Sequence, residues 1–210
     1  MKNAVKISIS AAMITVAIAF LVGCSKDDES LVSGGFNSVI TAKVDGVAGI
    51  TITSVLAVND PEYDPNTGVY YANIVGEPVS FSSGSFAITL PTSGIKSSYL
   101  TDITEFFEYF MKADDKGNLK VSNPSARIMD IDFIGFNSVS EKEFYVMGTF
   151  FYATSDKSVT CMFVYVDSDV DVTGGANVSV SLKKGWNRVY ISDKLTTKAP
   201  NGLKWYFDPF

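Results

Sequence analysis

The feature that most constrains the fold is an alternation of apolar and polar residues with a period of two. Towards the C-terminus, Val178, Val180 and Leu182 alternate with Ser179 and Ser181. Neighbouring side chains of a strand lie on opposite faces, so this segment predicts a strand with one buried and one solvated face. The same period recurs and predicts strands at residues 40–44, 50–58, 69–75, 86–90, 127–134, 143–154, 160–166, 177–182, 186–191 and 203–207.

These strands predict an all-β fold, namely an antiparallel β-sandwich of about eight to ten strands with one short amphipathic helix. A closed lipocalin-like β-barrel is the alternative, and its mouth would hold a small apolar ligand. The strands around Phe150 and Phe163 are apolar on both faces. We therefore expect them to lie centrally in a sheet or beneath the helix.

Two connections follow from the turn residues. Asp45-Gly46 is typical of a hairpin turn, which would pair residues 40–44 with residues 50–58. Residues 59–68 contain two prolines and three acidic residues, which predicts a loop.

One segment departs from the period of two. Apolar residues recur there at spacings of three and four, as on one stripe of a helix. They are Leu100, Ile103, Phe106, Phe107, Phe110 and Met111. Asp102, with Glu105 three residues later, forms a capping-box pattern, and Gly117 lies beyond the end. The pattern predicts a helix over residues 101–113 that packs against a sheet or closes one end of the sandwich.

The composition excludes several classes of function. The chain has no histidine, which excludes Ser-His and Cys-His catalysis and the usual zinc sites that contain histidine. It has 17 basic and 23 acidic side chains and no cluster of Lys and Arg, so no nucleic-acid partner is expected. Of the two cysteines, Cys161 lies in an apolar run and is expected to behave as a small core residue.

The first 23 residues have the layout of a secretory signal, with two lysines in residues 1–6 and an almost wholly apolar run over residues 7–22. The run ends in Leu21-Val22-Gly23-Cys24, which resembles the lipobox of bacterial lipoproteins. The resemblance implies that residues 1–23 are removed and that Cys24 receives diacylglycerol, which anchors the chain to a membrane. The alternative is an ordinary signal peptide or a short hydrophobic anchor.

The residues after Cys24 carry a second signal. Lys26, Asp27, Asp28 and Glu29 resemble the acidic tag that directs Bacteroidetes lipoproteins to the outer face of the outer membrane. The alternative is a flexible tether that holds the protein clear of the lipid headgroups. We expect a lipidated tether at residues 24–35 and a single β-sandwich domain at residues 36–210.

The hairpin sequence Ala42-Lys43-Val44-Asp45-Gly46 supports the same class of protein. It resembles the first hairpin of small all-β lipoproteins of the Bacteroidetes, in which such a hairpin follows the tether. The resemblance favours a sandwich and implies no particular activity.

A cluster of acidic residues is a candidate metal site. Asp167, Asp169 and Asp171 are spaced by two, which places their carboxylates on one face of an extended segment. Ca²⁺ binds six to eight oxygen ligands, so these residues are candidates for a structural calcium site. The alternative is a solvated strand edge whose charges discourage aggregation.

Exposed aromatic residues are the candidate ligand site. The alternation places Trp186, Arg188 and Tyr190 on one face of their strand. Aromatic faces stack on the C–H surfaces of sugars, so this face could bind a glycan. The alternative is that Trp186 and Trp205 anchor the core.

The leading hypothesis is therefore a cell-surface lipoprotein that acts as a non-catalytic module, either binding glycans or serving as an accessory subunit of an outer-membrane complex. No catalytic residue is assigned. The alternatives are a structural lipoprotein that binds another protein and a hydrolase that uses paired carboxylates. Glu105 and Glu108 on the helix, and Asp130 and Asp132 on one strand face, are the carboxylate pairs available for hydrolysis.

Overall fold

A computed structural model describes residues 38–210 except 45, 46, 48, 65–68, 112–117, 141, 142 and 210. The predicted signal peptide, the whole of the predicted tether and several predicted features therefore lie outside the described residues. These features are Cys24, Lys26, Asp27, Asp28, Glu29, the turn Asp45-Gly46 and Gly117. None of the helices in the described part has the length and apolar character needed to cross a bilayer.

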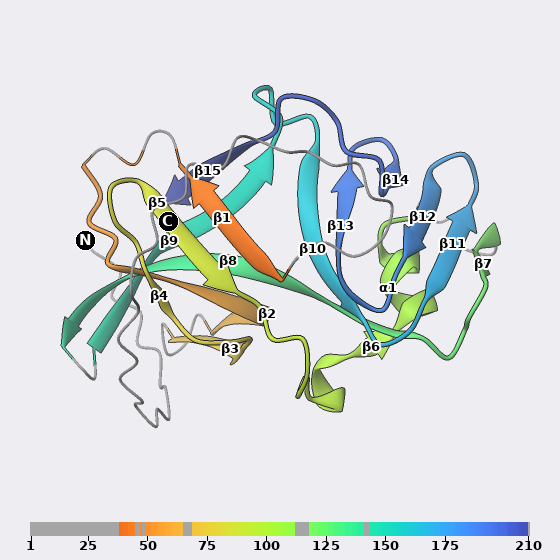
Figure 1. The fold of residues 1–210 in the computed structure, drawn as a ribbon, viewed down its shortest axis with the longest axis horizontal. Helices are drawn as coiled ribbons and strands as arrows, with labels where there is room; N and C mark the ends of the chain where they lie inside the picture. The colour runs from red at the N-terminus through yellow and green to blue at the C-terminus, as the bar shows by residue number, and fades with distance from the viewer. Residues whose placement is uncertain are drawn as a thin grey trace.

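The described residues form fifteen strands, one α-helix and one short 3-10 helix (Figure 1). The first elements are β1 (Val39–Lys43), β2 (Ser54–Asp64), β3 (Val69–Ile74), β4 (Val79–Ser80), β5 (Ser85–Thr89), η1 (Ser97–Tyr99), β6 (Thr101–Asp102) and α1 (Ile103–Tyr109). The later strands are β7 (Lys120–Val121), β8 (Arg127–Ser140), β9 (Glu143–Ala153), β10 (Thr160–Val166), β11 (Val170–Gly174), β12 (Val178–Leu182), β13 (Gly185–Ile191), β14 (Leu195–Thr196) and β15 (Lys204–Pro209).

The strands form two sheets, and the predicted β-sandwich is confirmed. The large sheet has the order β3-β2-β8-β9-β10-β13-β14-β12-β11-β7, with β15 beside β9, β4 beside β2 and β6 beside β8. The small sheet contains β1 and β5. The large sheet is not closed on itself, so the lipocalin-like barrel is not the fold. Five strands were not predicted, namely β4, β6, β7, β11 and β14, and four of these have only two residues.

The main core lies between the two sheets. Figure 1 shows β1 and β5 side by side across the large sheet. Phe86 of β5 lies against Trp205 of β15 and Phe133 of β8, and all three rings are buried. The ring centroids of Phe86 and Trp205 are 5.5 Å apart in an edge-to-face arrangement, a geometry that aromatic pairs prefer. The interpretation of the two tryptophans as core residues agrees with this burial.

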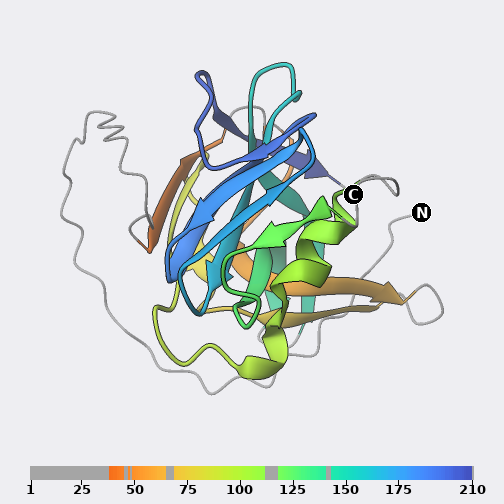
Figure 2. The same ribbon diagram turned by 90° about the vertical axis from the view of Figure 1, so that its right-hand side faces the viewer.

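A second core lies on the other face of the large sheet, where α1 packs against the strands (Figure 2). Ile103 and Phe107 of α1 are completely buried there with Val164 and Val166 of β10. Cys161 and Phe163 of the same strand belong to the main core. β10 is thus apolar on both faces because each face meets a separate core, as the sequence predicted.

The helix is shorter than the predicted span of residues 101–113. Thr101 and Asp102 form β6, which pairs with Ile128 and Arg127 of β8. Asp102 caps the helix, because its Oδ1 accepts hydrogen bonds from the backbone N–H groups of Thr104 (2.8 Å) and Glu105 (3.1 Å). This cap fixes the start of α1 at Ile103, two residues later than predicted, and α1 ends at Tyr109.

The predicted partner of the first strand was wrong. β1 pairs antiparallel with β5, and Ile40 lies opposite Ile88 and Ala42 opposite Phe86. Residues 54–58, which belong to the segment expected to pair with β1, instead pair with β8 in the large sheet. Pairing with β5 places the apolar side chains of both strands over the main core, and local sequence pattern alone does not select between the two partners.

The predicted loop at residues 59–68 was also wrong for its first half. β2 continues through this segment to Asp64 and pairs with β3. The register shifts between Asn59 and Glu62, so Asp60 and Pro61 form a β-bulge. A bulge tolerates a proline inside a strand because the ladder is already interrupted there.

Candidate functional site

The candidate site lies at a gap beside strand β8. β2 pairs with β8 up to Val58 opposite Asp132, and β6 pairs with Arg127 and Ile128. Between these two partners, residues 129–131 of β8 face no paired strand on that side. The side chain of Asn59 bridges the gap, since its Nδ2 donates a hydrogen bond to the backbone oxygen of Asp130 over 3.0 Å.

An open hollow of about 560 Å³ occupies this gap, and we call it the β8 hollow. It lies where the bulge of β2, η1, the start of α1 and the first residues of β8 meet. Its lining is mainly polar. The polar side chains are those of Asn59, Asp60, Asn73, Ser98, Tyr99, Thr101, Asp102, Glu105, Arg127 and Asp130.

The bulge has a buried polar side chain, that of Asn59, and a residue with a positive φ, Asp60. Asn59 is only 6% exposed and is one of two buried polar residues in the described part of the chain. Its Oδ1 accepts a hydrogen bond from Asn73 Nδ2 (3.4 Å), so both ends of the amide are engaged. Asp60 has a φ of 52°, in the left-handed region that few residues other than glycine adopt. Bulges and strained residues of this kind concentrate at functional sites.

The charges around the β8 hollow are mostly negative. Four carboxylates line it, those of Asp60, Asp102, Glu105 and Asp130, against the single guanidinium of Arg127. Arg127 Nη2 donates a hydrogen bond to the backbone oxygen of Leu100, which ties β8 to the segment between η1 and β6. Both signs of charge therefore line the β8 hollow, beside the neutral amides of Asn59 and Asn73.

The pKa of Asp130, a half-buried residue that lines the β8 hollow, is raised above its ordinary value. The largest cause is loss of hydration, and the negative charge of Asp60 acts in the same direction, while a backbone hydrogen bond opposes both. Asp132, two residues further along the same strand face, has its pKa raised from 3.8 to about 6. Loss of hydration is again the main cause, with the charge of Asp130 second. The pair therefore binds protons more readily than ordinary aspartates do.

The residues predicted to stack on a glycan lie together, but in the interior. Trp186 is 3% exposed and Tyr190 is 4% exposed, and both belong to the main core. Trp186 Nε1 donates a hydrogen bond to the backbone oxygen of Pro91 (2.8 Å). The guanidinium of Arg188 lies over the ring of Phe163, 5.7 Å from its centroid. These rings have no face open to a sugar, and their burial supports the core interpretation.

The predicted calcium ligands have separate partners. Asp167 Oδ1 accepts a hydrogen bond from the backbone N–H of Arg127 (3.0 Å). Asp169 forms an ion pair with Lys183 (3.0 Å), and Asp171 accepts a hydrogen bond from Ser181 Oγ. Within the described ranges, no three acidic or cysteine side chains come close enough to hold a metal ion. The three carboxylates thus have different partners in this arrangement, and structural calcium stays a prediction.

Cys161 is buried, as the sequence predicted for a core thiol. Burial raises its pKa to about 12, so the thiol stays protonated and unreactive at neutral pH.

The sequence predicted only part of the β8 hollow. It singled out Asp130 and Asp132 as a pair on one strand face and Asp102 and Glu105 at the helix start. Asn59 was not predicted as a site residue, and Asp60 and Pro61 were assigned to a loop because of the prolines and acidic residues of that segment. The sequence Asn59-Asp60-Pro61, two polar residues and a proline directly after the apolar residues 55–58, is a signal that could have revealed a bulge.

Comparison of the chain with protein-family models, with curated proteins and with solved structures gives no match in any of the three.

Proposed function

We propose that the protein is a lipid-anchored, surface-exposed and non-catalytic binding module that recognises glycans in the β8 hollow. The observation that carries the proposal is the convergence of amide, carboxylate, guanidinium and phenol groups in one open hollow at a break in the sheet. The Cys24 lipobox and the acidic residues after it support the surface location.

The chemistry of the β8 hollow suits a ligand rich in hydroxyl groups. Each sugar hydroxyl both donates and accepts hydrogen bonds, and the hollow offers carboxylate acceptors at Asp60 and Asp130 and a guanidinium donor at Arg127. Tyr99 adds an aromatic ring at the rim, which can contact the C–H face of a sugar. Its half-exposed position leaves it more accessible than the buried Trp186 and Tyr190.

The test of glycan binding is thermal unfolding of the full-length chain against a panel of host and dietary polysaccharides. A ligand present at 100 times its Kd adds about 2.7 kcal/mol to the stability of the folded state, which raises the Tm measurably. We expect one glycan class to raise the Tm, and Asp60→Asn and Asp130→Asn to reduce that rise. Asp193→Asn, which alters an exposed carboxylate outside the β8 hollow, is the matched control and should leave the rise unchanged.

Two outcomes would contradict the glycan proposal. A flat response across the panel would remove it and favour a protein partner, either for a structural lipoprotein or for an accessory subunit of a membrane complex. Equal responses in wild type and in both β8-hollow variants would place the glycan elsewhere on the molecule.

The location is tested separately. Cys24→Ala should abolish incorporation of labelled fatty acid and release the chain from the membrane fraction. Replacement of the four residues Lys26, Asp27, Asp28 and Glu29 by alanine should keep the lipid but protect the protein from protease added to intact cells. Lipid incorporation in the Cys24→Ala variant would contradict the assignment of the anchor.

The raised pKa values of Asp130 and Asp132 favour one second candidate, a hydrolase that uses carboxylates. Acid–base hydrolysis needs one protonated and one ionised carboxyl group, and two coupled aspartates with raised pKa values can supply both. Release of reducing ends from a polysaccharide by the wild type, and its loss in both Asp130→Asn and Asp132→Asn, would replace the binding proposal with this one.

A further inference from the structure

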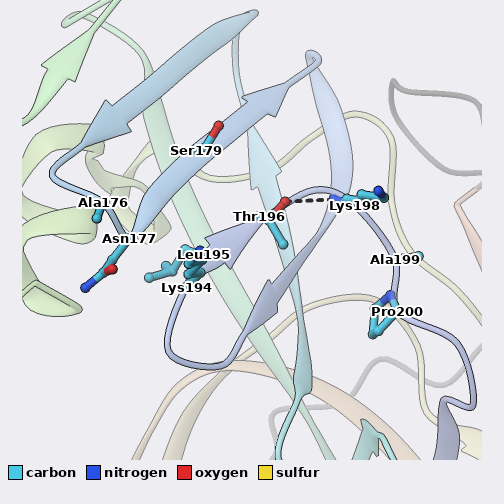
Figure 3. A pocket seen from close by; sticks show the side chains of 9 residues that line it. All are labelled: Ala176, Asn177, Ser179, Lys194, Leu195, Thr196, Lys198, Ala199 and Pro200. Atoms are coloured by element: carbon cyan, nitrogen blue, oxygen red, sulfur yellow. Dashed lines mark hydrogen bonds between the residues drawn. The ribbon is translucent and has the colours of Figure 1, made fainter.

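A second hollow, of about 380 Å³, lies beside β14, and we call it the β14 hollow. Figure 3 shows its lining, which comes from the turn before β12, from β12 itself, from Lys194 just before β14, from β14 and from the segment that follows β14. It shares no residue with the β8 hollow. The β14 hollow is therefore a separate site from the one in the proposed function.

The hollow arises from the insertion of β14 between β12 and β13. β14 pairs in parallel with β12, with Ser179 opposite Thr196, and antiparallel with β13, with Tyr190 opposite Thr196. The strand has only two residues, so the chain leaves the sheet directly after Thr196. The backbone N–H of Lys198 donates a hydrogen bond to Thr196 Oγ1 (3.1 Å), which holds this exit in place (Figure 3).

The charge of the β14 hollow is opposite to that of the chain. The whole sequence has 23 acidic and 17 basic side chains, yet the described lining contains Lys194 and Lys198 and no acidic residue. Among the described residues, no carboxylate lies within ion-pair distance of either lysine. The neighbouring Asp193 accepts a hydrogen bond from Ser192 Oγ and is not part of the lining. Two cations without a counter-charge therefore border one hollow.

The rest of the lining defines the shape of the complementary ligand. Leu195, only 4% exposed, lies with Ala176, Ala199 and Pro200 in the apolar part of the lining. Ser179 and Thr196 place two hydroxyl groups on adjacent strands beside it. A complementary ligand has an apolar face, hydroxyl groups and a negative charge. We propose that the β14 hollow binds an acidic saccharide unit of the uronic-acid type.

The test compares D-galacturonate with neutral D-galactose on the full-length chain, using amide chemical shifts in two-dimensional NMR. Galacturonate should shift the amides of Ser179, Thr196 and Lys198 with saturation, and galactose should not. Binding should weaken as salt rises, because both lysines are exposed to screening. A double Lys194→Gln, Lys198→Gln variant should bind at least about tenfold more weakly. Lys43→Gln, an exposed lysine on the small sheet, is the matched control and should bind normally.

Three results would overturn the inference. They are equal shifts with galactose, galacturonate shifts confined to residues outside the β14 hollow, and an affinity of the double variant equal to that of the wild type. The comparison of the two sugars and the salt dependence both use the wild type, so a poorly folded variant does not remove the test. Loss of glycan binding at the β8 hollow would leave the galacturonate result unaffected, and the reverse also holds.

Discussion

Asp132→Asn should stabilise the protein at neutral pH and have almost no effect in acid. The pKa of Asp132 in the folded state is about 6, above its usual 3.8. The folded chain therefore holds this proton more tightly than the unfolded chain does. The contribution to stability is fully present below pH 3.8 and is lost as the pH rises through about 6. An asparagine, which never ionises, keeps the hydrogen-bonding shape without this loss.

The size of the effect follows from the pKa. A rise from 3.8 to about 6 corresponds to at most about 3 kcal/mol against the ionised carboxylate in the folded state. Neighbouring atoms cost the Asp132 carboxylate part of its hydration, but the residue still contacts solvent. Solvent screening therefore reduces this value, and we expect about 1 kcal/mol of stabilisation at pH 7.5. The gain should decline below pH 6 and vanish below pH 4.

Urea unfolding at pH 3.5, 5.5 and 7.5 measures this dependence for the wild type, for Asp132→Asn and for the control Asp193→Asn. The control removes an exposed carboxylate of the loop between β13 and β14 and should show no comparable gain. A destabilised Asp132→Asn variant at pH 7.5, or a gain that is the same at all three pH values, would refute the reasoning. A confirmed gain would mean that the wild type keeps a costly carboxylate beside the β8 hollow, which is expected of a functional group.

Three further predictions concern the fold. Gly148→Ala should lower the free energy of unfolding by more than about 2 kcal/mol, because the new Cβ would lie 2.2 Å from the backbone oxygen of Asp208. A neutral result in urea unfolding would contradict the pairing of β9 with β15. Phe107→Ala should cost about 3–5 kcal/mol, because the ring is completely buried beneath α1. A loss below about 1 kcal/mol would mean that α1 does not pack there. Asp156→Asn should be less stable than the wild type at pH 7, because hydrogen bonds from Thr154 and Ser158 lower the pKa of Asp156 to about 2. The difference should close as the pH falls through about 2, and a difference that persisted there in acid unfolding curves would contradict the assignment.

The sequence predicted strands best where the alternation or apolar run within a single segment is enough to identify them. The predicted strand at residues 160–166 coincides with β10, and its two apolar faces correspond to the two cores. Strand pairing was harder to predict, since residues 50–58 and β5 offer β1 equally apolar alternation. β1 pairs with β5 because the two strands together pack over the main core. That core is built from residues far apart in the chain, which a local pattern does not reveal.

The candidate site was predictable only in part, because it too depends on how distant strands pair. The carboxylates of Asp130 and Asp132 are visible as polar residues in an apolar strand. The β8 hollow itself depends on a gap between β2 and β6 and on a bulge that carries Asn59 and Asp60. Turn residues such as Pro61 predict a loop when the segment is considered alone. The segment is a strand because it continues to pair with β3 beyond the bulge.

The limits of local pattern also explain why Trp186 and Tyr190, predicted as a ligand-binding face, are buried. Alternation correctly placed Trp186 and Tyr190 on one strand face, but it does not reveal which face of the sheet is covered. That face meets the main core, and Trp186 Nε1 bonds there to the backbone oxygen of Pro91, just after β5, so the rings are buried.

The most direct test of the central claim is a map of amide chemical-shift changes on the full-length chain as each glycan of the panel is added. The account predicts that at least one glycan shifts the amides of Asn59, Asn73, Tyr99 and Asp130, the residues that meet at the gap beside β8. A map in which these four amides stay unmoved with every glycan would contradict the assignment of the β8 hollow as a glycan site.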